Sequence, residues 1–235
     1  MMNTRSKLSE FEHFTKLADQ WWSESGKFKI LHDLQPLRVQ YIIDQIWPKK
    51  INKLKILDLG CGGGLVCEPL AKLGANVTGV DFVKQNIEAA KIHAMKNKLK
   101  INYIHKDVND IKLKSSYDVI IAYEVLEHLK DWPDLIKKIK TLLKANGKLI
   151  ISTINRNFFS KIIAIYFAEK ILKWIPEDTH DYNKFIKPKE LETVLQRENF
   201  KVNNFTGLVF NPIENIWKLN ANKTKINYFC SAKLI

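Results

Sequence analysis

The sequence Lys55–Gly64, KILDLGCGGG, carries the strongest structural signal in the chain. A short apolar run that breaks into glycines and continues into a helical pattern is typical of a strand, a tight turn and a helix. Glycine lets such a turn adopt backbone angles that residues with a Cβ resist, and it lets the backbone approach a ligand closely. We therefore expect a ligand-binding turn at the end of a buried strand.

Asp81 completes this pattern. It follows a second predicted strand, 76–80, and lies 21 positions after Gly60. In that place a carboxylate can accept hydrogen bonds from the two hydroxyls of a ribose. Together the glycine turn and the acid predict an adenosine-containing ligand bound to an open α/β sheet.

The spacing of the glycines distinguishes between adenosine ligands. Hydride-transferring enzymes use G-x-G-x-x-G, whereas this chain has Leu65 at the third glycine and instead reads G-x-G-x-G from Gly60 to Gly64, preceded by Asp58. No Gly-Lys-Ser/Thr follows, which excludes a phosphate-binding P-loop. The departure favours S-adenosylmethionine, which has no pyrophosphate to place on the helix N-terminus. The alternative is a glycine-rich turn that binds nothing.

Chain length and cysteine content limit the possible classes of protein. A chain of 235 residues suits one α/β domain over 1–235, and the sequence has neither a membrane-spanning apolar run nor a leader-like N-terminus. Cys61, Cys67 and Cys230 lack the spacing of a metal site or a disulfide framework, which suits a reducing compartment. We expect a cytoplasmic protein.

The net charge of +13 has two interpretations, nucleic acid or anionic lipid as a partner. The excess is mostly lysine, spread along the chain together with many Ile and Asn residues. No arginine-rich cluster, RNA-binding signature or zinc-finger spacing accompanies it. We therefore expect no nucleic-acid partner and favour a lipid surface.

The chain beyond the glycine turn alternates predicted strands and helices, which implies a doubly wound, mostly parallel α/β sheet. Its last two strands would form an antiparallel hairpin, and a turn at 145–147 would end one helix. Residues 1–50 would form a helical cap that Pro36 interrupts, and 155–187 would form an insertion. The predicted strands are 55–59, 76–80, 101–105, 118–122, 148–153, 201–206 and 227–233, and the helices are 66–73, 84–97, 132–143 and 188–199.

Segments along nearly the whole chain match the motifs of one family. They are FKILH at 28–32, PLR at 36–38, LDLGCGGG at 57–64, EVLEH at 124–128, STINRN at 152–157, THD at 179–181, KFIKP at 184–188 and TGLVFNP at 206–212. By these segments the chain resembles the ubiquinone-biosynthesis O-methyltransferases, which are S-adenosylmethionine-dependent methyltransferases of the seven-stranded class. Gln35 is a small departure, because the family usually has Asn there.

The resemblance implies a Rossmann-like, seven-stranded class I methyltransferase fold. It also implies methylation of polyprenylated catechols, of the 2-polyprenyl-6-hydroxyphenol type, and of 3-demethylubiquinol. Association with other enzymes of quinone synthesis follows from the same resemblance. The alternatives are a methyltransferase for another small phenol or acid, and an RNA- or protein-binding module on this scaffold.

Residues for the methyl donor come from four places in the sequence. Arg38 can hold a carboxylate bidentately, although an arginine after a proline turn is often only a surface residue. Gly60 and Gly62 would lie against the methionine and ribose, and Asp81 would bind the ribose hydroxyls. The resemblance assigns a donor contact to Tyr123, just past the strand 118–122.

Asp107, just past the strand 101–105, is a further candidate for the donor site. Its carboxylate would accept a hydrogen bond from the adenine amino group. An acid that caps the chain after a strand is the alternative.

Glu124, Glu127 and His128 cluster at the end of the strand 118–122 and are the candidates for catalysis. A phenol ionises near pH ~10, so its proton must be removed by a base or its pKa lowered by a metal. His128 is our first choice for the base because an imidazole titrates near pH ~6.5. Packing at the strand–helix junction is the alternative role for His128.

A divalent metal offers a second way to acidify a catechol hydroxyl. Glu127 and His128, together with His180 or Asp181, would be its ligands, and oxygen donors favour Mg²⁺. No spacing in the sequence fixes this set.

The insertion 155–187 contains the most apolar helix candidate, 158–175. Its lysines occupy one side and leave a wide apolar face. That composition is typical of a helix in a lipid interface, of a lid over a pocket or of a dimer face. Since a polyprenyl substrate is confined to the bilayer, we expect a lid that also contacts the inner face of the membrane.

Overall fold

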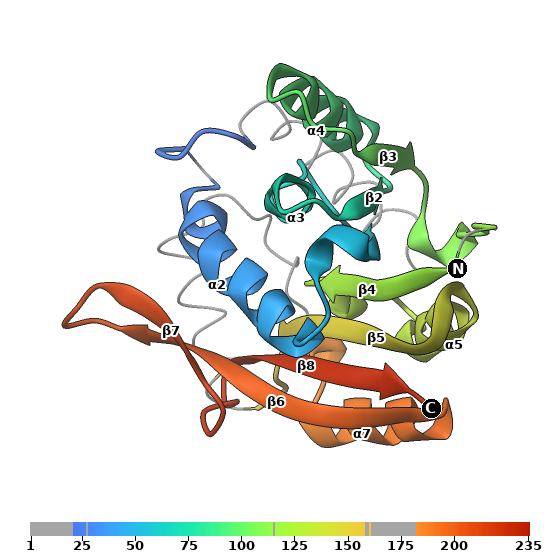
Figure 1. Cartoon of the computed structure of the whole chain (residues 1–235). Helices are drawn as coiled ribbons and strands as arrows, with labels where there is room; N and C mark the ends of the chain where they lie inside the picture. Colours follow the sequence, from blue (N-terminus) through green and yellow to red (C-terminus); the bar gives the residue numbers. More distant parts are fainter. Residues whose placement is uncertain (1–20, 27, 115, 158–159, 161–181) are drawn as a thin grey trace, which may run out of the picture.

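One mixed sheet organises the part of the chain that the computed structural model describes, which is residues 21–26, 28–114, 116–157, 160 and 182–235. Within it, eight strands are arranged in the order β3-β2-β1-β4-β5-β8-β6-β7 (Figure 1). The strands are β1 Lys55–Leu59, β2 Asn76–Asp81, β3 Asn102–His105, β4 Tyr117–Tyr123, β5 Leu143–Ile154, β6 Phe200–Asn211, β7 Ile216–Asn220 and β8 Asn227–Leu234.

The strands β3, β2, β1, β4 and β5 are parallel, and β8 then runs antiparallel to β5 and β6. This is the doubly wound sheet that the sequence predicts. Because parallel strands end at one edge, the residues after β1, β2 and β4 come together there. That edge is where a ligand of such a sheet binds.

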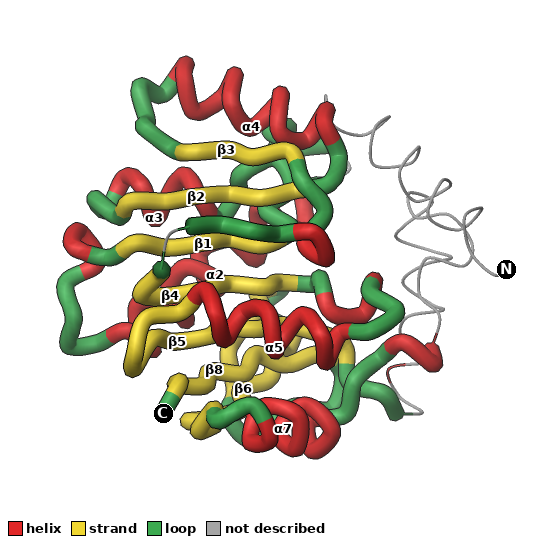
Figure 2. The backbone as a smooth tube through the Cα atoms, turned by 90° about the vertical axis from the view of Figure 1, so that its right-hand side faces the viewer, coloured by secondary structure: helices red, strands yellow, loops and turns green. Residues whose placement is uncertain are grey.

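Helices cover both faces of the sheet (Figure 2). On one face α5 and α7 pack against Leu57, Ile120 and Ile151, and on the other α2, α3 and α4 pack against alternate strand residues such as Ile56 and Ile121. This burial on both sides explains why the central strands are apolar throughout. The helices are α2 Lys29–Ile46, α3 Cys67–Lys72, α4 Lys84–Lys96, α5 Trp132–Leu142 and α7 Pro188–Arg197, with short 3₁₀ turns η2 Ile51–Lys53, η3 Val108–Asp110, η4 Leu126–His128 and η5 Tyr182–Lys184.

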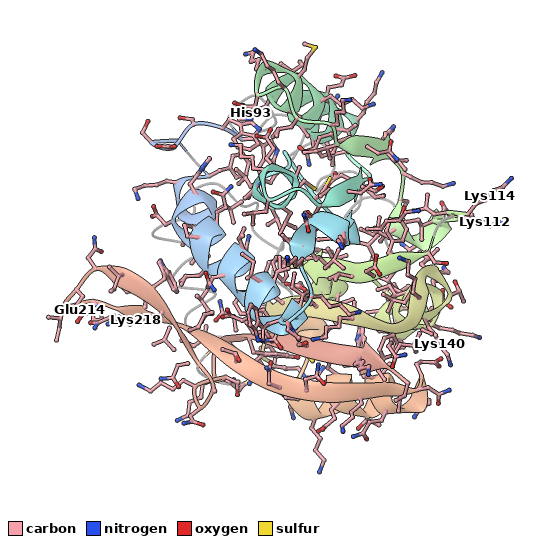
Figure 3. All side chains as sticks on the ribbon, in the orientation of Figure 1. His93, Lys112, Lys114, Lys140, Glu214 and Lys218 are labelled. Atoms are coloured by element: carbon pink, nitrogen blue, oxygen red, sulfur yellow. The ribbon has the colours of Figure 1, made fainter. Side chains whose placement is uncertain are left out.

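The strand count of seven is wrong, because the described residues form eight. The additional strand, β7, pairs with β6, and the ring of Phe210 lies 5.1 Å from that of Trp217 across the pair. The last two predicted strands are antiparallel neighbours, as expected, but the hairpin joins β6 to β7 and β8 lies between β5 and β6. Glu214 and Lys218 mark the projecting end of this hairpin (Figure 3).

Two predicted interruptions lie inside continuous secondary-structure elements. Pro36 lies inside α2, where burial of Leu34, Val39 and Ile42 on the helix offsets the loss of one amide donor. The turn expected at 145–147 lies within β5, and Asn146 has a left-handed φ of 61° there. Four residues of β5, 144–147, stand opposite the single residue Asp118 of β4, so the chain turns out of the ladder there, just after α5 has ended at Leu142.

The cap and the insertion are only partly described. Residues 1–20 lie outside the described residues, and so do 158–159 and 161–181, which hold most of the predicted lid. In the described part of the chain no helix is long and apolar enough to cross a bilayer.

Candidate active site

The glycine turn follows β1 and is tied to β2. The backbone N–H groups of Gly60 and Cys61 both donate to the carbonyl oxygen of Val80, at 2.8 and 3.0 Å. Gly60 has a φ of +70°, and a Cβ there would lie 2.5 Å from Cγ2 of Val125. Both the backbone angle and the space therefore require glycine, as the sequence predicts.

Asp81 is buried beside this turn and faces several donors. Its Oδ2 accepts a hydrogen bond from the Gly62 N–H at 2.9 Å, and its Oδ1 accepts from the Val83 N–H at 2.8 Å and from Asn86 Nδ2 at 3.2 Å. Burial raises the pKa of Asp81, and these hydrogen bonds oppose the rise. The carboxylate is thus fixed in one orientation at the carboxyl edge of β2.

Asp58, which precedes the turn, is a second buried acid on this side. Its Oδ2 accepts a hydrogen bond from Sγ of Cys67 at 3.2 Å. Burial raises the pKa of Asp58 to about 7, against the opposing effects of the Cys67 thiol and the positive charge of Arg38. The sequence identifies Asp58 only as a neighbour of the glycines, and its protonation depends on packing that no motif encodes.

Arg38 extends from α2 toward the end of β4. Its guanidinium nitrogen Nη2 lies 3.8 Å from Oε1 of Glu124, and its Cζ lies 5.7 Å from the centre of the Tyr123 ring. The Tyr123 hydroxyl donates to the backbone oxygen of Arg38 at 3.2 Å. Nε of Arg38 is buried and has no hydrogen-bond partner among the described residues, so it can still donate to a ligand carboxylate.

Asp107 caps a turn. Its Oδ1 accepts hydrogen bonds from the backbone N–H of Asn109 at 2.8 Å and from Asn109 Nδ2 at 2.9 Å, at the start of η3. This is the capping role given above as the alternative. The adenine contact of Asp107 stays a prediction.

Glu124 and Glu127 form a pair of carboxyl groups just past β4. Glu124 accepts a hydrogen bond from Ser152 Oγ at 2.8 Å, and Glu127 accepts one from Thr153 Oγ1 at 2.8 Å. Glu124 has a left-handed φ of 53°, a conformation that costs a residue with a Cβ about 1 kcal/mol and is common at functional sites.

Glu127 is the buried member of the pair. Its Oε1 has no donor among the described residues, and burial raises its pKa well above the ordinary value, with a further rise from the charge of Glu124. The folded state therefore favours the protonated form of Glu127 more than an exposed glutamate would.

His128 ends η4, immediately after Glu127. Its backbone N–H donates to the Val125 oxygen at 3.1 Å, and its side chain is half-buried. In the described ranges no three His, Cys, Asp or Glu side chains gather as metal ligands. His180 and Asp181, the other predicted ligands, lie outside those ranges, so the metal stays a prediction.

Ser152 and Thr153 are site residues that the sequence analysis missed. They lie at the carboxyl end of β5, where Ser152 is in register with Tyr123 of β4. A signal was present, because two hydroxyl residues follow the buried apolar run 149–151 at the edge that carries the site.

The base of the insertion is tied to the C-terminal part of the sheet. Asn155 donates from its backbone N–H to Ile226 and from Nδ2 to Thr224, both at 2.8 Å, and the Ile186 N–H donates to Ile154 at 3.0 Å. Both ends of the insertion therefore leave from the edge of the sheet where β4 and β5 end.

Comparisons with known proteins agree with this geometry. A family model described as "Methyltransferase domain" matches residues 30–204. The fold is similar to magnesium protoporphyrin IX methyltransferase from Synechocystis PCC 6803 with bound S-adenosylhomocysteine, at a TM-score of 0.71 and 18% identity over 97% of this chain and 100% of that one. A possible histamine N-methyltransferase from Thermotoga maritima is similar at a TM-score of 0.69 and 14% identity, over 96% and 100% of the two chains.

The fold and the matched domain define a methyltransferase with the class I fold. Two proteins called ubiquinone biosynthesis O-methyltransferase are much more similar in sequence. The one from Pelagibacter ubique is 44% identical, over 97% of both chains, and the one from Rickettsia typhi is 45% identical, over 94% of this chain and 90% of its own. The chain belongs to the family of ubiquinone biosynthesis O-methyltransferases.

Proposed function

We propose that this enzyme transfers a methyl group from S-adenosylmethionine to a hydroxyl of polyprenylated catechols of the 2-polyprenyl-6-hydroxyphenol type and of 3-demethylubiquinol. The observation that carries the proposal is the pair of carboxyl groups just past β4, where Glu124 and Glu127 accept from Ser152 and Thr153 and Oε1 of Glu124 lies 3.8 Å from Nη2 of Arg38. Acid–base groups for a phenol thus adjoin the residues proposed for the methyl donor. The names of the relatives point to ubiquinone biosynthesis, and the resemblance of the motifs implies these substrates.

The methyl donor lies, in this proposal, along the carboxyl edge of β1, β2 and β4. Arg38 binds its carboxylate through the buried Nε, Gly60 and Gly62 allow its close approach, and Asp81 accepts from the ribose. Tyr123 contacts it from the end of β4, and Asp107 accepts from the adenine amino group.

Methyl transfer needs the acceptor hydroxyl to lose a proton. The acceptor oxygen attacks the methyl carbon, the bond from that carbon to sulfur breaks, and the electron pair stays on sulfur, which becomes a neutral thioether. Glu127 is buried and accepts from Thr153, whereas the side chain of His128 is half-buried at the same rim. We assign the base to His128, because an imidazole ring nitrogen can take the phenol proton.

A divalent cation fits the donor chemistry of the carboxylate pair. Oε1 of Glu127 is a buried oxygen without a donor, and Glu124 offers a second carboxylate beside it. As the alternative to His128 acting as base, we propose that Glu127 and His128 hold Mg²⁺ together with His180 or Asp181. A bound Mg²⁺ would acidify a coordinated hydroxyl.

We also propose that the enzyme works at the inner face of a membrane and associates there with other enzymes of quinone synthesis. The insertion 155–187 supplies the lipid contact, because its sequence is apolar on one side and lysine-bearing on the other. The net charge of +13 favours anionic head groups. Association with other enzymes rests on family membership.

Transfer of labelled methyl to a short-chain prenylated catechol and to a demethylubiquinol tests the function. We expect transfer to both. Transfer only to unprenylated phenols or acids would contradict the proposal and favour another acceptor. The same assay after treatment with a chelator tests the metal, and undiminished turnover would exclude it.

Flotation with anionic vesicles tests the membrane contact. The variant with Phe158, Phe159 and Ile163 all changed to Ser should bind vesicles less than the unchanged protein. Equal binding by the two would contradict the lipid role of the insertion.

A further inference from the structure

Trp21, from the segment that precedes α2, packs on the glycine turn. A Cβ on Gly62 would lie 2.5 Å from Cη2 of the Trp21 ring, and a Cβ on Gly63 would lie 2.5 Å from its Cγ. The ring is only 8% exposed. Gly62 and Gly63 are therefore needed for this indole to approach the turn, besides any approach to a ligand.

A chain of hydrogen bonds runs from this indole to Asp81. Nε1 of Trp21 donates to Oδ1 of Asn86 at 2.8 Å, and Nδ2 of Asn86 donates to Oδ1 of Asp81 at 3.2 Å. An indole N–H can only donate, so it fixes which end of the Asn86 amide faces it. The other end, the NH₂ group, then faces Asp81.

The orientation of Asn86 matters because its side chain is buried, at 2% exposure. If the amide turned over, its oxygen would face the carboxylate of Asp81 and its NH₂ would face the indole N–H. The amide oxygen would then face a carboxylate, which accepts, and the NH₂ group would face the indole N–H, which donates. Neither pair could form a hydrogen bond. Trp21 thus keeps the NH₂ group of Asn86 in place as a hydrogen-bond donor to Asp81, the acid proposed to bind the ribose.

Further contacts hold Trp21 in place. Its ring stacks on Phe28 with centroids 4.1 Å apart, and its carbonyl oxygen pairs with Nε2 of His32 at 2.8 Å. The next residue, Trp22, donates from Nε1 to the Gly63 oxygen at 3.0 Å and stacks on His93 of α4 at 3.5 Å. Figure 3 labels His93 beside α4, on the side of the N-terminal segment.

We propose that Trp21 is a positioning residue for the methyl donor, acting through Asn86 to orient the carboxylate of Asp81 toward the ribose. The inference rests on the proposed ribose contact of Asp81. It predicts that the indole N–H, and not only the bulk of the ring, contributes to donor affinity.

Trp21→Phe separates these two contributions, since it keeps an aromatic ring on the turn and removes the N–H. We expect it to weaken binding of S-adenosylhomocysteine about 5-fold by calorimetry, the effect of one net hydrogen bond of about 1 kcal/mol. KM for the acceptor should stay unchanged. Trp47→Phe is the matched control, because Trp47 is 77% exposed.

An S-adenosylhomocysteine analogue without the ribose hydroxyls tests the route through Asp81. Trp21→Phe should hardly change the affinity for this analogue. An equal loss for both ligands would contradict the proposal and leave Trp21 a packing role. Asn86→Ala is the second variant, and Trp21→Phe added to it should weaken binding no further, since both act on one chain of hydrogen bonds.

Asp81→Asn distinguishes failure of this inference from failure of the ribose contact itself. If Asp81→Asn weakens both ligands equally, the ribose contact is wrong and the inference falls with it. If Asp81→Asn affects only the ligand with ribose hydroxyls whereas Trp21→Phe affects both ligands or neither, the role of Trp21 alone is wrong.

Discussion

Asp81 and Glu127 are both buried acids at the carboxyl edge of the sheet, yet their surroundings differ. Asp81 faces donors on both carboxylate oxygens, from Gly62, Val83 and Asn86. Glu127 receives a hydrogen bond from Thr153 on one oxygen, while the other has no donor among the described residues. Its neighbour Glu124 raises its pKa further.

The difference in surroundings suits Asp81 to ligand binding and Glu127 to the chemical step. An acid that is fixed by backbone N–H groups keeps one charge and one orientation, which suits a constant ligand such as the methyl donor. An acid that shares a proton with a second carboxyl group can change its charge during a reaction. The predictions below test whether the two sides of the site can be changed independently.

The largest effect on turnover is expected from a substitution next to Glu127, at His128. His128→Asn removes the proposed base, so turnover should fall about 10²- to 10⁴-fold. Affinity for S-adenosylhomocysteine should remain that of the unchanged protein, which calorimetry can check. Turnover within a few-fold of normal in His128→Asn would rule out His128 as the base.

Asp81→Asn should weaken binding at the methyl-donor site and raise the Kd for S-adenosylhomocysteine about 10²-fold. The new amide can turn only one oxygen to the Gly62 and Val83 N–H groups, so one buried donor loses its partner. We expect the free energy of unfolding to fall by about 1–3 kcal/mol as well. Denaturant titration measures the second effect. A variant as stable as the parent would contradict the account of Asp81 as a fixed anion.

Arg38→Lys keeps the charge but removes the planar guanidinium and the buried Nε. Donor affinity should fall about 10-fold, because an ammonium cannot hold a carboxylate bidentately. KM for S-adenosylmethionine should rise while KM for the acceptor stays the same. If both KM values rise together, Arg38 serves the packing between α2 and β4 instead.

Glu127→Gln should change how stability depends on pH. The folded pKa of Glu127 lies above its unfolded value of 4.5, so the folded state binds the proton more tightly. Between pH 4.5 and that raised pKa, stability therefore falls as pH rises, by up to about 1.4 kcal/mol per pH unit for this group. The glutamine variant lacks this contribution, so its unfolding free energy should fall less steeply with pH. Identical slopes would show that Glu127 is ionised in the folded protein.

The local parts of this site could be predicted from the sequence. The turn at Gly60 and the acid at Asp81 follow from short patterns, and β1 begins and ends where predicted. The parallel direction of the strands β1 to β5 follows from the alternation of strands and helices. These features depend on residues close together in the chain.

The remaining features depend on contacts between distant residues. The hydroxyls of Ser152 and Thr153 reach Glu124 and Glu127 only through the register of β5 on β4. The eighth strand forms because residues after Asn211 fold back on β6. No periodicity in either segment records these pairings, and the contact of Trp21 with Asn86 spans 65 positions.

Calorimetric titration of S-adenosylhomocysteine into the Glu127→Gln variant tests the separation of the two sides most directly. Glutamine has the shape of the neutral acid and can still accept from Thr153, so the donor side should be undisturbed. We predict a Kd within about 2-fold of that of the unchanged protein. A Kd weakened as much as that of Asp81→Asn would contradict the account, because the two acids would then form one binding site.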